Sequence, residues 1–479
     1  MTDARWQSPL GTRYASEAMQ RLWGEPHRIA QWRRIWLALA EAESELGVAI
    51  PAAALREMRL HLDDADLAAA AVYEKRFRHD VMAHVHAFGE QAPAARPFLH
   101  LGATSAFVTD NADVVIMRDA LTLILGRLLD VIAALRQFAG EHASLPCLAY
   151  THFQPAQLTT VGKRATLWIQ DFALDAEAIG HRLDTLRLRG CKGTTGTQAS
   201  FLELLGGDHA KVRELEQRII DKLGFTDVFP VTGQTYPRKL DAQILDALSG
   251  VAQSASKFGA DIRLLQHEGE ILEPFEAEQI GSSAMAYKRN PMRAERMGGL
   301  ARHVISLQAS GAHTAAAQWL ERTLDDSANR RLTLPEAFLA TDAILLLAGN
   351  ISRGLEVRPG VIDQHVRQQM PFMVTERWLM LGVQGGGDRQ ALHEVIRRHS
   401  HAAATAVATG EPNNLLDRLV RDGAFDAIEQ ADLEAELEPV RYVGRAPEQV
   451  GEFLAEYLDP LVARLGNRVA APARAELTV

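Results

Sequence analysis

Hydrophobic positions recur at helical spacing along almost the whole chain. Residues 29–46 carry apolar side chains three and four positions apart with glutamates on the other faces, and residues 121–132 show the same spacing. Residues 98–145, 156–229 and 292–334 contain no proline. Intervals this long allow helices well above the globular mean of roughly 11–12 residues. The pattern therefore predicts an all-α protein built on unusually long helices.

Breaks in the pattern divide the chain into three helical domains. We expect an N-terminal domain over residues 1–104, a central long-helix bundle over 105–357 and a C-terminal domain over 358–479, where an Arg-Pro-Gly sequence interrupts the helical spacing. Long bundle helices bury more than one face, so we expect the chain to associate through its bundle. The alternative is a monomer whose smaller domains cover the apolar stripes.

Composition excludes several classes of function. The formal net charge of −10 argues against general nucleic-acid binding, although a pocket can still carry a local field for a small anion. Apolar stretches such as residues 343–349 are too short to span a membrane. The two cysteines, Cys147 and Cys191, form no disulfide framework and no metal spacing, so we expect a cytoplasmic protein without a metal site.

A basic segment at residues 76–86 has two interpretations. Arg78, His79 and Asp80 are placed for the N-terminus of a helix, where amides and the helix dipole favour a phosphate or carboxylate. The plainer interpretation is a polar helix start with solvated histidines, and this segment alone slightly favours it. A metal site does not fit, because His84 lies off the helix face shared by His79 and His86.

Other polar segments interrupt the predicted helices. Thr104 and Ser105 are natural helix caps whose hydroxyls and amides could equally hold a carboxylate. His152 lies in a helix break at residues 150–157 and could transfer a proton near neutral pH, although a lone histidine is more often structural. The Gly/Thr-rich residues 193–200 lack the lysine of a P-loop, and Ile271 stands where a zinc helix would need its second histidine.

The most unusual polar stretch is residues 281–295, between two strongly helical segments. Ser282, Ser283, Lys288 and Asn290 lie within it, and Pro291 disfavours a continuous helix. Polar loops held by rigid helices are where binding and catalytic groups concentrate. Residues 232–238 and 321–331 are further polar breaks, and the second offers arginine and serine donors suited to a phosphate.

Together these segments resemble the fumarase/aspartase superfamily, and within it the adenylosuccinate lyase family in the form found in animals. Residues 281–291 fit the superfamily pattern Gly-Ser-Ser-x-Met-Pro-x-Lys-x-Asn-Pro, and residues 287–293 and 321–327 carry the closer resemblance. The resemblance covers most of residues 8–335, and the C-terminal region matches no motif. Ala286 departs from the family's proline, which is expected to loosen the loop and to weaken or slow its closure.

The resemblance implies elimination of fumarate from adenylosuccinate, giving AMP, and from SAICAR, giving AICAR, without a cofactor. It assigns Ser282 as the base, Lys288 as a charge-stabilising group, His152 as the acid and Glu295 as the partner of a histidine. A serine hydroxyl needs cationic and amide donors to act as a base. The substrate-binding residues implied are Arg13, Tyr14, Arg78, His79, Asp80, His100, Thr104, Ser105, Gln234, Ser283, Asn290, Arg296, Arg322, Ser327 and Arg331. His79 and His100 could instead assist proton transfer.

The resemblance also implies a homotetramer whose active sites are shared between subunits. We expect small-molecule substrates and neither nucleic acid nor a membrane as partner. A lyase acting on argininosuccinate or aspartate is the nearest alternative, but those substrates lack the phosphate that residues 322–331 suit. A catalytically silent protein on the same scaffold is a second alternative, disfavoured by the presence of Ser282, His152, Lys288 and Asn290.

Overall fold

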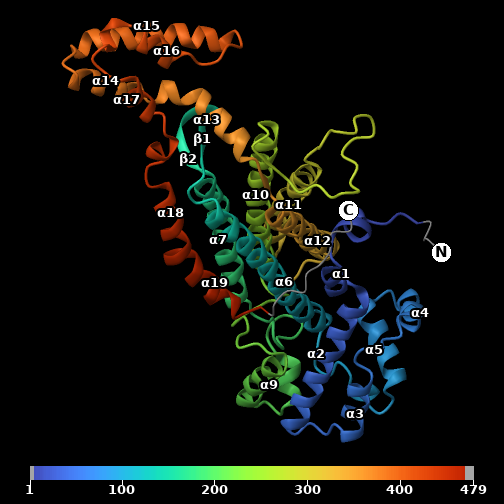
Figure 1. Cartoon of the computed structure of the whole chain (residues 1–479). Helices are drawn as coiled ribbons and strands as arrows, with labels where there is room; N and C mark the ends of the chain where they lie inside the picture. The colour runs from blue at the N-terminus through green and yellow to red at the C-terminus, as the bar shows by residue number, and fades with distance from the viewer. Residues whose placement is uncertain (1–4, 470–479) are drawn as a thin grey trace.

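The structure is a computed structural model that describes residues 5–469, and it is 69 % helical, which confirms the predicted all-α class. Long helices form a central bundle that runs diagonally through the molecule (Figure 1). They are α6 (Ser105–Glu141), α7 (Val161–Thr185), α10 (Lys239–His267), α11 (Met292–Ala317) and α12 (Asp325–Arg353).

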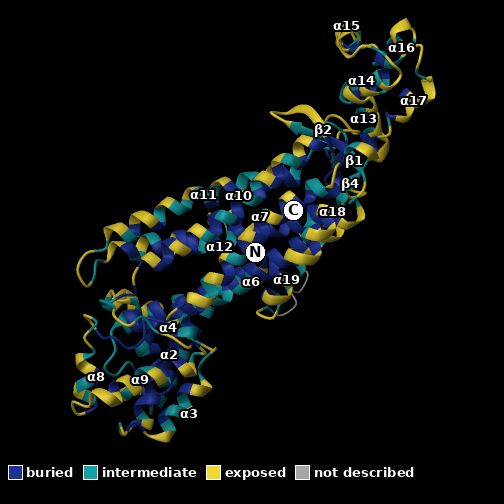
Figure 2. Cartoon of the chain, turned by 90° about the vertical axis from the view of Figure 1, so that its left-hand side faces the viewer, coloured by how far each residue is buried: buried dark blue, intermediate teal, exposed yellow. Residues whose placement is uncertain are grey.

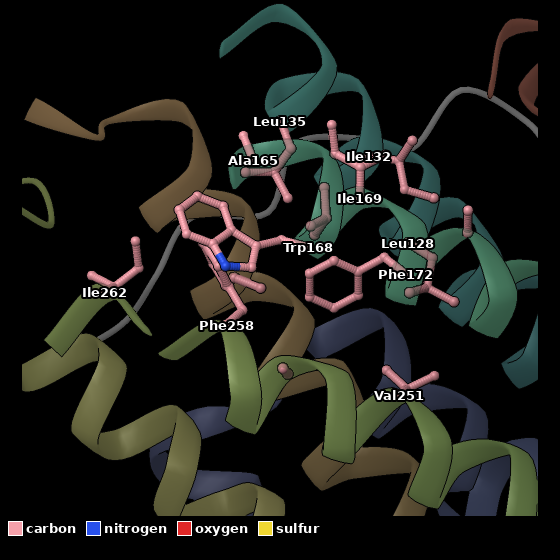
Figure 3. Packing of buried hydrophobic residues seen from close by; sticks show 14 of the residues in the cluster. Leu128, Ile132, Leu135, Ala165, Trp168, Ile169, Phe172, Val251, Phe258 and Ile262 are labelled. Carbon is pink, nitrogen blue, oxygen red and sulfur yellow. The ribbon is translucent and has the colours of Figure 1, made fainter. Parts of the chain in front are cut away.

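Apolar side chains on several faces of these helices make the bundle core. Trp168 and Phe172 of α7 meet Phe258 of α10 edge to face, with ring centroids 5.2 and 6.1 Å from that of Phe258 (Figure 3). The buried indole donates a hydrogen bond to Asp261 at 2.7 Å, so its polar atom is satisfied. Buried residues follow α6 and α7 through the bundle (Figure 2).

A smaller helical domain packs at one end of the bundle. Its elements are η1 (Leu10–Tyr14), α1 (Glu17–Trp23), α2 (Glu25–Glu45), α3 (Ala52–Leu60), α4 (Leu67–Phe77), α5 (Asp80–Gln91) and η2 (Arg96–Phe98). Two later helices, α8 (Ala199–Leu204) and α9 (His209–Lys222), complete its core, because Phe201, Leu215 and Ile219 pack into the same cluster as Trp36.

The C-terminal elements extend beyond the opposite end of the bundle and then return (Figure 1). They are α13 (Pro359–Met373), α14 (Thr375–Gln384), α15 (Arg389–Ala408), α16 (Leu415–Val420), η3 (Gly423–Phe425), α17 (Gln430–Ala435), η4 (Pro439–Tyr442), α18 (Ala446–Glu452), η5 (Phe453–Leu458) and α19 (Asp459–Gly466). Helix α13 packs against strands β1 and β2, while α18 and α19 run back along α7.

Two small antiparallel sheets interrupt the helices. Strand β1 (Pro146–Thr151) pairs with β2 (Gln154–Thr160), and β3 (Ile271–Leu272) pairs with β4 (Glu356–Val357). The helical spacing did not predict the first hairpin, and residues 150–157 were expected only as a helix break. The break is a two-residue turn between strands, with Thr151 opposite Gln154.

Helix α12 differs from the proline pattern. The proline-free interval ends at residue 334, and a proline inside a helix disfavours its continuation. The helix instead continues through Pro335. Its buried face packs against α6, α10 and α11, and this tertiary packing outweighs the local penalty of proline. Within residues 5–469, α12 alone is long and apolar enough to cross a membrane, but 78 % of its most apolar window is buried inside the protein, as in a core helix of a bundle.

Candidate active site

A cavity of about 870 Å³ lies where the N-terminal domain meets the bundle. Helices α2, α4 and α5, the start of α6 and the start of α12 all contribute to its wall. Nine of the predicted substrate-binding residues line it, although they come from distant parts of the sequence. They are Arg78, His79, Asp80, Thr104, Ser105, Gln234, Arg322, Ser327 and Arg331.

Three helix N-termini face this cavity, those of α5, α6 and α12. His79 is the N-cap of α5, and its Nδ1 accepts a hydrogen bond from the Met82 amide at 3.3 Å. A neutral His79 therefore carries its proton on Nε2, which lies 3.4 Å from the Ser105 hydroxyl. Thr104 occupies the N-cap position of α6, yet its side chain makes no capping hydrogen bond. Exposed amides and helix dipoles make this wall suitable for an anion.

Two of the arginines that line the cavity are held by carboxylates at its surface. Arg331 donates to Asp80 at 2.6 Å while its side chain is 58 % exposed. Arg322 donates to both carboxylate oxygens of Asp326, at 2.9 and 3.0 Å. These ion pairs fix the direction of each guanidinium but leave further N–H donors for a ligand.

A buried charged network lies beneath the arginines, and the sequence analysis missed it. Arg238 donates to Asp326 at 2.6 Å and to Asp110 at 3.1 Å. Burial alone would raise the pKa of Asp110, but Arg238 and Arg330 outweigh it and hold that pKa below its usual value. The available signal was Asp110 and Asp113, one helical turn apart near the start of α6.

Arg330 forms the second half of this network. It donates to Asp241 at 2.7 Å, to Asp113 at 2.9 Å and to the Tyr236 hydroxyl at 2.5 Å. Burial raises the pKa of Tyr236 well above its usual value, so the phenol stays protonated and donates to Asp241 at 2.6 Å. The floor of the cavity is thus a satisfied set of buried charges with a fixed geometry.

His100 lies beside the cavity in a left-handed backbone conformation, with φ of 64°. The Trp36 indole donates to its Nδ1 at 2.9 Å. Burial, with a smaller contribution from His79, lowers the pKa of His100 to about 4. Near neutral pH this imidazole is therefore uncharged and carries its proton on Nε2, where it can act as a hydrogen-bond donor.

His152 occupies the exposed turn of the β1–β2 hairpin. His152 and Phe153 both have positive φ, 53° and 57°. A two-residue hairpin turn with two left-handed residues usually contains Asn and Gly, so histidine and phenylalanine are conformationally costly here. Backbone strain of this kind clusters at functional sites.

The loop at residues 281–291 folds back on itself around Ser282. The Ser282 Oγ accepts hydrogen bonds from the amides of Ala284 and Met285, at 3.3 and 3.1 Å. The Asn290 side chain donates to the Gly281 carbonyl at 2.7 Å, which joins the two ends of the loop. A Cβ at Gly281 would collide with the Lys288 carbonyl oxygen, so only glycine fits. Two amides therefore already point at the proposed base, while Ser283 and Lys288 are exposed.

A further group of predicted residues surrounds Tyr14. The guanidinium groups of Arg13 and Arg296 lie 6.0 and 5.9 Å from the centre of the Tyr14 ring. Glu295 is exposed in the first turn of α11, and within residues 5–469 it forms no hydrogen bond with a histidine. The described part of the chain therefore provides no histidine partner for Glu295.

The structure does not bring His152 to the cavity of its own chain. The cavity lies at the start of α6 and the hairpin follows the end of α6, whose 37 residues span about 55 Å. The 281–291 loop lies at the hairpin end, because it precedes α11 and Arg289 pairs with Glu356 of β4. In Figure 1, β1 and β2 lie at the opposite end of the bundle from α2, α4 and α5.

Two family models and several solved structures match the chain. A family model described as "Lyase" matches residues 19–306, and one described as "Adenylosuccinate lyase C-terminus" matches residues 371–453. The crystal structure of 3-carboxy-cis,cis-muconate lactonizing enzyme from Pseudomonas putida has a TM-score of 0.81 at 24 % identity, covering 96 % of this chain and 99 % of that one. A fumarate lyase from Mesorhizobium sp. BNC1 has a TM-score of 0.77 at 23 % identity, covering 94 % and 98 %. The chain is thus a lyase on the fumarase/aspartase fold.

Proteins named adenylosuccinate lyase match over nearly the whole length. The one from Saccharomyces cerevisiae is 51 % identical over 453 residues, 94 % of each chain. The one from Schistosoma mansoni is 47 % identical over 95 % of this chain and 96 % of its own, and the one from Pyrococcus abyssi is 31 % identical over 95 % and 99 %. The chain belongs to the adenylosuccinate lyase family. This match includes the C-terminal region, where sequence analysis matched no motif.

Proposed function

We propose that the chain eliminates fumarate from adenylosuccinate to give AMP, and from SAICAR to give AICAR. In each reaction a base removes a proton from the carbon beside a carboxylate, the C–N bond breaks, and an acid protonates the departing nitrogen. The observation that carries the proposal is the cavity, where arginines, hydroxyls and three helix N-termini suit a substrate with a phosphate and carboxylates. Argininosuccinate and aspartate offer no phosphate to this group.

Ser282 is the proposed base. Its hydroxyl is too weakly acidic unless donors stabilise the alkoxide, and the amides of Ala284 and Met285 already donate to Oγ. Lys288 adds a positive charge from the same loop. Loss of the proton moves negative charge onto the neighbouring carboxylate, and one preorganised donor is worth roughly 2.7–4 kcal/mol in comparable oxyanion sites. Asn290 and Lys288 are the proposed donors.

His152 is the proposed acid, since it is exposed and is held in a strained turn. Glu295 has no histidine partner among residues 5–469 of its own chain, and we propose that a second copy supplies one. In the cavity, Arg322, Ser327 and Arg331 are proposed to bind the phosphate. Arg13, Tyr14 and Arg296 are proposed to bind other polar parts of the substrate, with Arg78, His79, Asp80, His100, Thr104, Ser105, Gln234 and Ser283.

We propose a cytoplasmic homotetramer in which each active site combines several subunits. The distance along α6 supports this, because one chain keeps His152 far from its own cavity. Exposed leucines on the bundle also support it: Leu167 and Leu174 on α7 and Leu264 on α10 are 50, 54 and 42 % exposed. Leu167 and Leu174 lie two turns apart on one helix face, as expected of a stripe covered by another helix.

Hybrid oligomers test the shared site. His152→Ala and Arg331→Glu chains, carrying different affinity tags, are co-expressed and purified through both tags. Each variant alone should be nearly inactive, but a random hybrid should recover up to about a quarter of wild-type activity, because some sites take His152 and the cavity from different intact chains. No recovery in hybrids that bind both tags would contradict the shared site.

The substrate is tested by absorbance. Purified wild-type protein should convert adenylosuccinate and SAICAR, and argininosuccinate and aspartate should remain unchanged. The proposed mechanism uses no metal ion, so EDTA is expected to leave the rate unaltered. A protein that converts none of the four substrates would be the catalytically silent alternative.

A further inference from the structure

A fully buried carboxylate, Glu270, lies between the end of α10 and strand β3. Its Oε1 accepts a hydrogen bond from His365 Nδ1 at 2.9 Å and one from the Tyr150 hydroxyl at 3.4 Å. Its Oε2 is 3.9 Å from a guanidinium nitrogen of Arg164. Burial raises the pKa of Tyr150 above its usual value, so the phenol keeps the proton that it donates. A buried carboxylate needs partners of this kind.

Glu270 joins four segments of the chain. Tyr150 belongs to β1, Arg164 to α7 and His365 to α13 of the C-terminal domain. Glu270 itself precedes β3 and the 281–291 loop, and its backbone carbonyl accepts a hydrogen bond from the Arg358 amide at 2.9 Å. The carboxylate therefore joins the hairpin, α7 and α13 to the segment that leads into the 281–291 loop.

These contacts lie directly behind the turn that carries His152. Tyr150 is two residues before His152, and its ring packs 5.8 Å from that of Phe153. Arg164 lies over the Tyr150 ring at 5.9 Å and donates to the Leu148 carbonyl. The turn is exposed, and the backbone of its two residues is in the left-handed conformation. The orientation of His152 therefore depends on how firmly the contacts of Tyr150 and Arg164 hold strand β1.

We propose that Glu270 is a positioning residue for His152, and that α13 takes part in catalysis by holding Glu270 through His365. The proposal rests on the proposed acid role of His152. Glu270 is not a catalytic residue here, since it is fully buried and reaches the turn through Tyr150. Loss of its charge would release Tyr150, Arg164 and His365 together and let the hairpin move.

The first test is Glu270→Gln, which keeps the shape and removes the charge. We expect kcat to fall on the order of 10- to 100-fold, the scale of a 1 Å displacement of a catalytic group. The KM should change less than about twofold, because Tyr150, Arg164 and His365, which hold the carboxylate, are not among the residues that line the cavity. Glu216→Gln is the matched control. Glu216 lies on α9, remote from the hairpin, and the substitution removes its ion pair with Lys192 but should keep wild-type kcat.

A double-mutant cycle with His152 distinguishes a role of Glu270 in positioning His152 from a general loss of structure. His152→Ala should lower the rate by about 10²–10⁴, and adding Glu270→Gln to it should lower the rate no further. An additive loss would overturn the positioning role, whereas an active His152→Ala variant would instead overturn the proposed acid. If Glu270→Gln does not fold, Tyr150→Phe, which removes one hydroxyl, takes its place in the cycle.

The role of α13 is tested by rescue. His365→Ala should reduce kcat as Glu270→Gln does, while His365→Asn should restore most of it, because the asparagine amide can donate from the position of Nδ1. Equal rates for the alanine and asparagine variants would contradict the part assigned to α13.

Discussion

The two ends of the bundle differ in how firmly they hold the proposed functional groups. The cavity end carries groups proposed to bind the substrate, and the hairpin end carries the proposed acid and base. At the cavity end, arginines are held by Asp80 and Asp326 above a buried network of further ion pairs. At the hairpin end, His152 and Lys288 are exposed, and only Ser282 has its donors already in place. Within one chain, the groups proposed to bind the phosphate are therefore already held in place, whereas the proposed acid is exposed to solvent.

The difference follows from what each end must do. A phosphate and carboxylates carry fixed charge, so donors that are already oriented bind them without reorganisation. Buried charges such as Arg238 and Asp110 are tolerable only when paired, and pairing makes them rigid. The proposed acid and base must instead come within hydrogen-bond reach of the reacting atoms, and in this structure they lie on an exposed turn and a loop. The variants below test whether binding and chemistry separate in this way.

The largest effect is expected for Ser282→Ala. Turnover should be lost, with a fall of at least about 10³-fold, because no other group takes the proton. The same variant should still bind AMP, since its cavity is untouched, and calorimetry would measure that binding. Loss of AMP binding would show that the loop also takes part in binding and would break the comparison, whereas near-normal activity would remove Ser282 from the role of base.

The sequence predicted which residues would lie in polar segments better than it predicted how the fold arranges those residues at the two ends of the bundle. The segment around His79 was expected at a helix N-terminus, and the cavity residues from 78 to 331 do converge. Each of these signals is local in sequence: a capping pattern, a polar loop or a run without proline. The helical class and the unusual helix lengths were predictable for the same reason.

What the sequence did not predict depends on contacts between distant residues. The hairpin at residues 146–160 forms because β1 and β2 pair and α13 covers them. Asp110 and Arg238 are ordinary charged residues until the fold buries them together, and Glu270 is one glutamate among many until three partners surround it. The separation of His152 from the cavity also needed the direction of α6.

Arg331→Ala should affect binding alone. Loss of one charge-assisted contact is worth roughly 1.5–3 kcal/mol, so we expect KM to rise about 10- to 100-fold with kcat nearly unchanged. Arg397→Ala is a suitable control, because Arg397 is a similarly exposed arginine paired with a glutamate in α15. A fall in kcat with constant KM would place Arg331 among the groups that act in the chemical step instead.

A pH experiment tests the stability of the domain that carries the cavity. Glu43 on α2 is fully buried, neither carboxylate oxygen has a hydrogen-bond partner in the described structure, and burial raises its pKa from 4.5 to about 8. Between these values the folded state holds a proton that the unfolded state releases. Stability should therefore fall as pH rises through this window, by up to about 1.4 kcal/mol per pH unit.

Glu43→Gln removes this dependence while keeping the shape. The melting temperature of the variant minus that of the wild type should increase from pH 6 to pH 8, as measured by fluorescence. Glu41→Gln on the same helix, where the side chain pairs with Arg59 and Lys222, should show no such increase. Parallel curves for wild type and Glu43→Gln would mean that Glu43 does not retain its proton.

The smallest effect is expected at Ala286, where the family pattern has proline. The Lys288 amide donates to the Met285 carbonyl at 3.0 Å, so residues 285–288 form a β-turn with Ala286 at its second position. Proline is favoured there because its fixed φ matches the turn. A compatible substitution by proline stabilises the ordered loop by about 0.4–1 kcal/mol, because it lowers the conformational entropy of the unordered loop. Ala286→Pro should therefore raise kcat/KM by roughly two- to fivefold.

The gain should disappear in a Ser282→Ala background while AMP affinity stays constant, because the restraint acts on the loop that carries the base and not on the cavity. A change in AMP affinity instead would mean that the two ends are coupled.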